Sequence, residues 1–157
     1  NNEAGDYISI YAHIQEDWKD LLIRLLTVLG RIGLGGEKST GKGGFELIEI
    51  EPFKDFASVS TPGGFVTLSD FVPKSSDPVD GFWSTRIKLG WLGGNLQNQG
   101  RSFKKPFIAL QAGSCFKTSE VRPFYGRMVE NIAPFHPEVV QYGLALPLAV
   151  HKDCFNF

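Results

Sequence analysis

One stretch of this chain repeats its apolar residues at helical spacing, and it limits the fold more than any other feature. From Glu16 to Gly30 the chain reads EDWKDLLIRLLTVLG, with an apolar residue at nearly every third or fourth position. Glu16 and Asp17 suit the positive N-terminal end of a helix, and Gly30 suits its C-terminal stop. The pattern predicts one amphipathic helix that ends at Gly30.

Two segments that alternate between apolar and other residues flank this helix. They are YISIYAHI, residues 7–14, and FELIEIE, residues 45–51. A period of two predicts strands, and in the second segment we expect Ile48 and Ile50 to point inward. The chain therefore begins with a predicted strand, helix, glycine-rich loop and strand, a βαβ-type start.

The rest of the chain is rich in glycine, proline and aromatic residues and carries short strand signals. We predict strands in GFVTL (64–68), FWSTRIKLGW (82–91), KKPFIALQAGSCF (104–116) and VVQYGLALPLAV (139–150), and a loop tip in LGGNLQNQGRS (92–102). Trp83, Ile87 and Leu89 should share one face, and Pro147 should restrict the last strand to an edge or stand among its final residues. These elements predict an α+β fold in a single domain, 1–157.

Charge and cysteine content narrow the class of function. The formal net charge is -1, so any nucleic-acid surface has to be a local patch. Cys115 and Cys154 lie far apart and form no metal-binding or disulfide pattern, which favours a reducing cytoplasmic location without cofactors. No apolar run approaches the ~20 residues of a membrane helix.

The stretch GLGGEKSTGKGGFEL, residues 33–47, contains a near match to the phosphate-binding loop of ATPases. Gly36, Gly41 and Lys42 fit that pattern. However, Gly43 replaces the hydroxyl residue that holds magnesium, and the loop precedes a predicted strand rather than a helix. We therefore expect no nucleotide hydrolysis.

The glycines leave two interpretations open from local chemistry. They can form a flexible connector, or they can let the backbone approach a phosphodiester chain and aim N–H groups at it. Lysines and hydroxyls would add charge and neutral donors to phosphate oxygens. In the second interpretation the RNA-binding residues are Arg31, Gly33, Gly35, Gly36, Lys38, Ser39, Thr40, Gly41, Lys42 and Gly43.

Several motifs in a fixed order give the chain a family resemblance. The loop follows a G-hydrophobic-G-G-x-basic-S-x-G-x-G pattern from Gly33 to Gly43, and TLS (67–69), AGSCF (112–116) and YGLALPL (142–148) come after it. In these motifs the chain resembles the RAMP superfamily of CRISPR–Cas proteins. Within that superfamily it is most similar to the family of the fourth subunit of the type III-A Csm complex. The resemblance covers nearly the whole of this chain and is to the C-terminal half of the members of that family.

The resemblance implies a ferredoxin-like (RRM-like) domain with a glycine-rich loop after its first helix and long irregular insertions. It also implies a non-catalytic role in antiviral defence, in which the subunit grips the repeat-derived 5′ tag of the guide RNA. The implied protein partners are the large polymerase-type signalling subunit and the neighbouring backbone RAMP subunit.

Two alternatives remain open. Some RAMP relatives cut RNA with histidine, but no spacing links His13, His136 and His151 into a nuclease centre. The chain could also be a protein-interaction domain with a glycine-rich connector.

Three further sets of residues are candidates for contacts or charge on the surface. Tyr7 and Tyr11 could stack on bases or pack against a partner. The glutamates of residues 45–51 are expected on a solvated face rather than around a metal. A secondary phosphate-contacting surface could be formed by Ser84, Arg86, Lys88, Arg101, Lys104 and Lys105.

Overall fold

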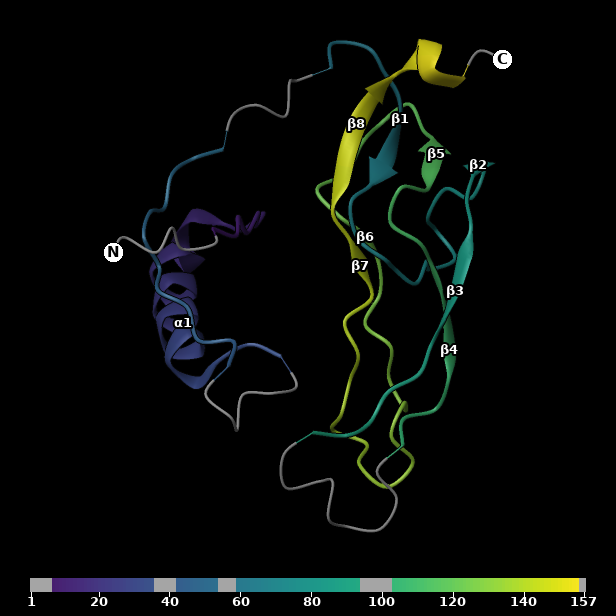
Figure 1. Ribbon diagram of the computed structural model, residues 1–157. Helices are drawn as coiled ribbons and strands as arrows, with labels where there is room; N and C mark the ends of the chain where they lie inside the picture. The colour runs from purple at the N-terminus through teal and green to yellow at the C-terminus, as the bar shows by residue number, and fades with distance from the viewer. Residues whose placement is uncertain (1–6, 36–41, 54–58, 94–102, 156–157) are drawn as a thin grey trace. The chain divides into compact units, whose positions relative to one another are not determined.

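The computed structural model describes residues 7–35, 42–53, 59–93 and 103–155. The chain divides into two compact units, Asn1–Asp55 and Phe56–Phe157. The first unit contains the helix α1, and the second contains all the described strands (Figure 1).

The helix of the first unit begins and ends later than the sequence predicts. A 3-10 turn, η1 (Glu16–Trp18), leads into α1 (Lys19–Ile32), which ends at Gly33 rather than at Gly30. Gly33 has φ +88°, and its N–H donates to the carbonyl oxygen of Leu29 at 2.8 Å. This left-handed backbone is the conformation that glycine adopts at little cost, so Gly33 is the C-terminal cap.

Gly30 has a different role from the predicted one. It is buried inside α1, and the Phe45 N–H donates to its carbonyl oxygen at 3.1 Å. A Cβ at this position would collide with the carbonyl oxygen of Phe45. Glycine at position 30 therefore allows the returning chain to approach the helix, and the prediction that it stops the helix is wrong.

The two segments predicted as strands beside the helix are not strands in the structure. Residues 7–14 and 45–51 have no strand assignment, and the inward-facing residues of the second are Phe45 and Leu47 rather than Ile48, which is 72% exposed. Alternation shows which side chains share a face, but it does not show which face meets the helix or supply a pairing strand. Tyr11 of the first segment contacts Phe53, which lies two residues after the second. Their rings pack edge to face with centroids 4.7 Å apart.

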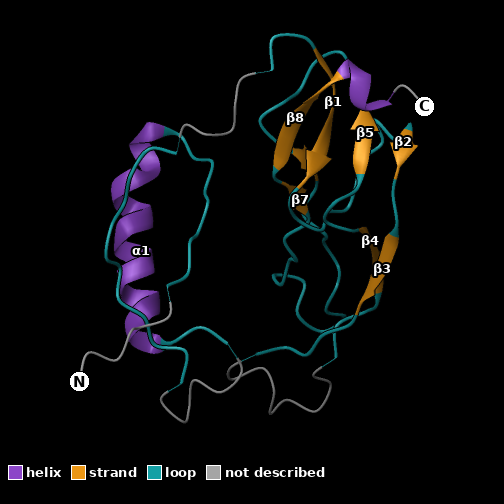
Figure 2. Ribbon diagram, turned by 45° about the horizontal axis from the view of Figure 1, so that its top comes forward, coloured by secondary structure: helices purple, strands orange, loops and turns teal. Residues whose placement is uncertain are grey.

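The second unit is built around a four-stranded antiparallel sheet (Figure 2). Its strands lie in the order β2 (Gly81–Phe82), β5 (Cys115–Lys117), β1 (Pro62–Thr67) and β8 (Pro147–His151). Pro147 begins an edge strand, as predicted, because proline cannot donate to a central ladder. A 3-10 turn, η4 (Lys152–Phe155), follows β8.

Two smaller antiparallel ribbons complete this unit. They pair β3 (Thr85–Lys88) with β4 (Phe107–Leu110), and β6 (Tyr125–Gly126) with β7 (Leu144–Ala145). Three predicted long strands are therefore each split in two; the split between β4 and β5, for example, is a turn at Gly113, where φ is +87°. Most of the predicted loop tip, residues 94–102, lies outside the described residues.

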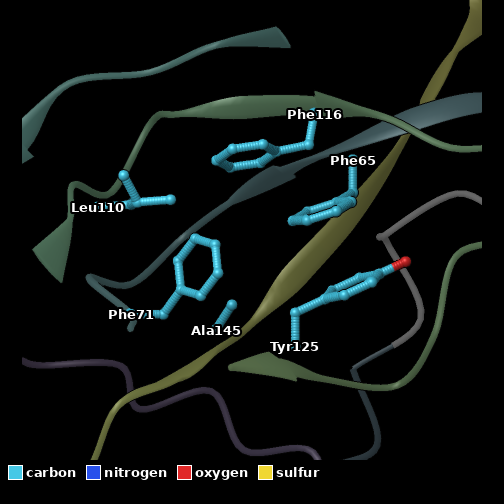
Figure 3. Packing of buried hydrophobic residues seen from close by; sticks show 6 residues of the cluster. All are labelled: Phe65, Phe71, Leu110, Phe116, Tyr125 and Ala145. Atoms are coloured by element: carbon cyan, nitrogen blue, oxygen red, sulfur yellow. The ribbon is translucent and has the colours of Figure 1, made fainter. Parts of the chain in front are cut away.

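The core of the second unit is aromatic. Phe65 and Tyr125 stack face to face with ring centroids 4.1 Å apart, and Phe116 packs beside them (Figure 3). The full cluster is Phe65, Phe71, Leu110, Phe116, Tyr125 and Ala145. In contrast, Trp83, Ile87 and Leu89, which were predicted to share one strand face, are all more than half exposed.

The structure is thus a mixed α+β fold, as the sequence predicts. It has one α-helix among the described residues, and its described strands pair in antiparallel sheets. None of the described helices combines the length and the apolar character needed to cross a bilayer.

Candidate functional site

The glycine-rich loop is closed at its base by the backbone. The N–H of Leu34 donates to the carbonyl oxygen of Gly43 at 2.8 Å, just beyond the C-terminal end of α1. Gly43 has φ +79°, and a Cβ there would collide with the carbonyl oxygen of Leu34. Together with the bond from Phe45 to Gly30, this contact fixes both ends of the loop to the helix.

Half of the predicted RNA-binding residues lie at this closed base. Arg31 is exposed in the last turn of α1, and Lys42 is exposed beside Gly43. Gly35 has φ +110° but open space where a Cβ would lie, so its glycine is required by the backbone alone. The remaining residues, Gly36, Lys38, Ser39, Thr40 and Gly41, lie outside the described residues.

The base of the loop limits how an anion could be held. The amides of Gly33 and Leu34 already donate to carbonyl oxygens within the unit, so they are not available to a phosphate. The C-terminal end of α1 also carries partial negative charge, which Arg31 offsets. A phosphate would therefore depend on basic side chains and on amides farther along the loop. Because residues 42–53, the described chain after the loop, contain no helix, the arrangement does not match a magnesium–nucleotide site.

The three short motifs that follow the loop in sequence meet in the second unit. The Thr67 N–H donates to the carbonyl oxygen of Ser114 at 2.9 Å. The Ser69 hydroxyl donates to the carbonyl oxygen of Leu144 at 3.1 Å and accepts from the Leu146 N–H at 3.0 Å. TLS therefore binds both AGSCF and YGLALPL through hydrogen bonds, and these motifs act as scaffold.

The predicted basic surface on β3 has an acidic partner that the sequence analysis missed. Arg86 and Lys88 both approach Asp70, at 3.5 and 2.5 Å, and the N–H of Ala112 donates to the same carboxylate at 2.8 Å. The hydrogen bond from Lys88, and then that from Ala112, lower the pKa of Asp70 below its ordinary value. Because these groups are distant in sequence, no local pattern could have paired them.

The two histidines of the second unit each have a local carboxylate partner. His136 lies 3.2 Å from Glu138 through Nδ1. His151 lies 3.0 Å from Asp153 through Nδ1, and its Nε2 lies 2.7 Å from the hydroxyl of Thr61. Thr61 and Asp153 can therefore orient the imidazole of His151, but these three side chains lie at the exposed end of β8.

Metal chemistry has little support among the described residues. Glu46, Glu49 and Glu51 are all exposed, as predicted for a solvated face. Across the described ranges, no three histidine, cysteine, aspartate or glutamate side chains gather closely enough to hold a metal ion.

In comparisons with known proteins, no family model matches the chain and no curated sequence gives a significant match.

Proposed function

We propose that this chain is a non-catalytic RNA-binding subunit of a type III-A CRISPR effector ribonucleoprotein. In this role it grips the repeat-derived 5′ tag of the guide RNA during antiviral defence in the cytoplasm. It docks the large polymerase-type signalling subunit and the neighbouring backbone RAMP subunit. Within the α+β class, we assign its fold to the ferredoxin-like RAMP domain.

The observation that carries this proposal is the anchored base of the glycine-rich loop. A connector needs no fixed ends, whereas the Leu34–Gly43 hydrogen bond joins the two ends of this loop and the Phe45–Gly30 hydrogen bond ties the returning chain to α1. Its base presents Arg31 and Lys42 to solvent. A fixed loop with basic side chains loses less entropy on binding a phosphate backbone than a free chain would.

The proposal divides the loop residues by role. Arg31, Lys38 and Lys42 supply positive charge for phosphates, and Ser39 and Thr40 supply neutral donors. Gly33 and Gly43 shape the base, because both have positive φ. Gly35, Gly36 and Gly41 leave room for the RNA backbone.

The test is made on the complex assembled with the chain. Lys38→Ala together with Lys42→Ala should lower the affinity for tagged guide RNA and reduce its salt dependence by about one unit of log–log slope per lysine. The melting behaviour should barely change, because exposed lysines contribute under ~0.5 kcal/mol to folding.

A matched control uses two exposed lysines that are not part of the loop. Lys19 and Lys117 form surface pairs with Glu16 and Asp80, and changing both to alanine should leave the salt slope unaltered. If the loop variant binds tagged guide with the parental affinity and slope, the loop is a connector and the proposal fails.

A further inference from the structure

The second unit contains a cavity of about 290 Å³, lined by β3, β4 and the chain around Gln141. This volume lies near the lower end of small-molecule sites, which span about 300–1,000 Å³. The cavity belongs to a different unit from the glycine-rich loop, and it combines apolar walls with a few charged groups.

Backbone hydrogen bonds hold the walls of the cavity in place. The N–H of Phe71 donates to the carbonyl oxygen of Leu110 at 3.0 Å, and the N–H of Val72 donates to that of Gly143 at 3.0 Å. Phe71 is fully buried, so its side chain belongs to the core as well as to the wall. The site is therefore preformed, and a ligand would not have to order it.

The polar groups of the cavity leave an excess of positive charge. Asp70 is the one carboxylate among the described lining residues, and it is already bound by Lys88, Arg86 and the Ala112 N–H. The second lining lysine, Lys104, donates to a neutral acceptor, the side-chain oxygen of Gln141, at 3.0 Å. Two lysines against one saturated carboxylate favour an anion in this cavity.

Next to these charges the cavity offers surfaces for a flat ring. Tyr142 lines it and is 62% exposed, so its ring can act as a stacking platform at the entrance. Phe107 and Leu89 add apolar wall, and the amide of Gln141 can donate or accept at a ring edge. Base–aromatic stacking and lysine–phosphate contacts are the usual means by which proteins hold nucleotides.

We propose that this cavity binds a nucleoside monophosphate, either free or as one nucleotide of a single-stranded RNA. Lys104 holds the phosphate, and Tyr142 stacks on the base. The site is separate from the glycine-rich loop, and its assignment does not rest on the function proposed for that loop.

The experiment titrates the purified chain with adenosine, uridine, cytidine and guanosine monophosphates by calorimetry. At least one should bind more tightly than its own nucleoside and than inorganic phosphate, because the site uses both the base and the phosphate. Lys104→Ala should weaken that binding about tenfold, as expected for a lost charge-assisted hydrogen bond. Lys105→Ala is the matched control, because Lys105 is an exposed neighbour that does not line the cavity.

A second variant and a short RNA decide between the remaining outcomes. Tyr142→Ala changes an exposed side chain, and it should reduce the preference for nucleotide over phosphate while circular dichroism stays unchanged. If only a trinucleotide RNA binds, and does so through Lys104, the ligand is RNA rather than a free nucleotide.

The proposal is overturned if neither ligand binds, or if Lys104→Ala and Lys105→Ala bind alike. It is also overturned if the nucleoside or inorganic phosphate binds as tightly as the nucleotide. The Lys38→Ala, Lys42→Ala chain should keep its mononucleotide affinity, so failure of the loop proposal would be seen separately.

Discussion

Asp70 collects polar contacts from parts of the chain that are distant in sequence. Its carboxylate meets Lys88 and Arg86 of β3 and the N–H of Ala112, which lies 42 residues farther along the chain. The side chain is only 14% exposed, so these contacts are weakly screened by solvent. At the scale of single residues, Asp70 joins the β3–β4 ribbon to the chain that follows β1.

Changing Asp70 to asparagine should therefore make stability less dependent on pH. The folded pKa of Asp70 lies below its ordinary value of 3.8. The stabilisation is then complete above that ordinary value and is lost as the pH falls through the lowered folded pKa. We expect Asp70→Asn to reduce the free energy of unfolding by about 1–2 kcal/mol near neutral pH.

Urea unfolding of both proteins over an acidic pH series measures this effect. The difference in stability between them should shrink as the pH falls below about 4. Asp80→Asn serves as the control, since Asp80 is an exposed partner of Lys117 and should contribute little at any pH. A difference that stays constant in acid would show that Asp70 acts without its charge.

Two glycines of the loop base provide a second prediction at this scale. Gly35 and Gly43 both have positive φ, which costs alanine about 1 kcal/mol, but only at Gly43 would a Cβ collide with backbone. We expect Gly35→Ala to lose about 1 kcal/mol and Gly43→Ala about 2–3 kcal/mol. Urea unfolding followed by the far-UV helix signal tests this order, and equal losses would mean that the Leu34–Gly43 closure does not stabilise the unit.

The helix α1 depends both on its own apolar periodicity and on the returning chain that contacts it at Gly30. Its apolar residues divide into a half-buried set, Leu22, Ile23, Leu26 and Leu29, and a more exposed set, Leu21, Leu25, Val28 and Ile32, which continues the spacing of three and four from Trp18 at the helix N-cap. The returning chain approaches the helix at Gly30, through the hydrogen bond from the Phe45 N–H.

The sign of the change in stability of Gly30→Ala shows whether helix propensity or the contact with Phe45 has the larger effect at this position. In an isolated helix, the change from glycine to alanine should stabilise by about 1 kcal/mol. Here the new Cβ would collide with the carbonyl oxygen of Phe45, so we expect a net loss of about 1–2 kcal/mol.

Thr27→Ala is the control for Gly30→Ala. The Thr27 hydroxyl donates back to the carbonyl oxygen of Ile23 within the exposed helix surface, so its removal should be neutral or slightly stabilising. Thermal unfolding followed by circular dichroism compares the two variants. A gain in stability for Gly30→Ala would mean that the 45–51 segment does not hold the helix.

These elements also show what the sequence can and cannot predict. Periodicity locates α1, and Pro147 correctly predicts an edge strand, because both follow from local backbone chemistry. The face of residues 45–51 and the partner of Lys88 depend on contacts between distant segments, which a single sequence does not encode locally. The glycine and lysine content of the loop identifies its residues from the sequence. The hydrogen bond from Leu34 to Gly43 that closes the loop could not be predicted in this way.

At the scale of the whole molecule, charge determines how RNA can be bound. The formal net charge of -1 provides no long-range attraction for a polyanion, so binding depends on local groups such as those of the glycine-rich loop. Part of the remaining basic surface is already occupied, since Arg86 and Lys88 share Asp70. If the chain acts as the proposed effector subunit, tight binding of guide RNA should therefore require the other subunits of that complex.

The purified chain should accordingly bind single-stranded RNA of guide length weakly and leave it uncut. Filter binding across a salt series should give a lower affinity than the assembled complex at every salt concentration, with a shallow slope that reflects few phosphate contacts. Gel analysis after incubation should show intact RNA, because His151 is held by Thr61 and Asp153 in a place that does not line the cavity. Specific cleavage that disappears in His13→Ala, His136→Ala or His151→Ala would instead favour an endoribonuclease, since a general base would then have been removed.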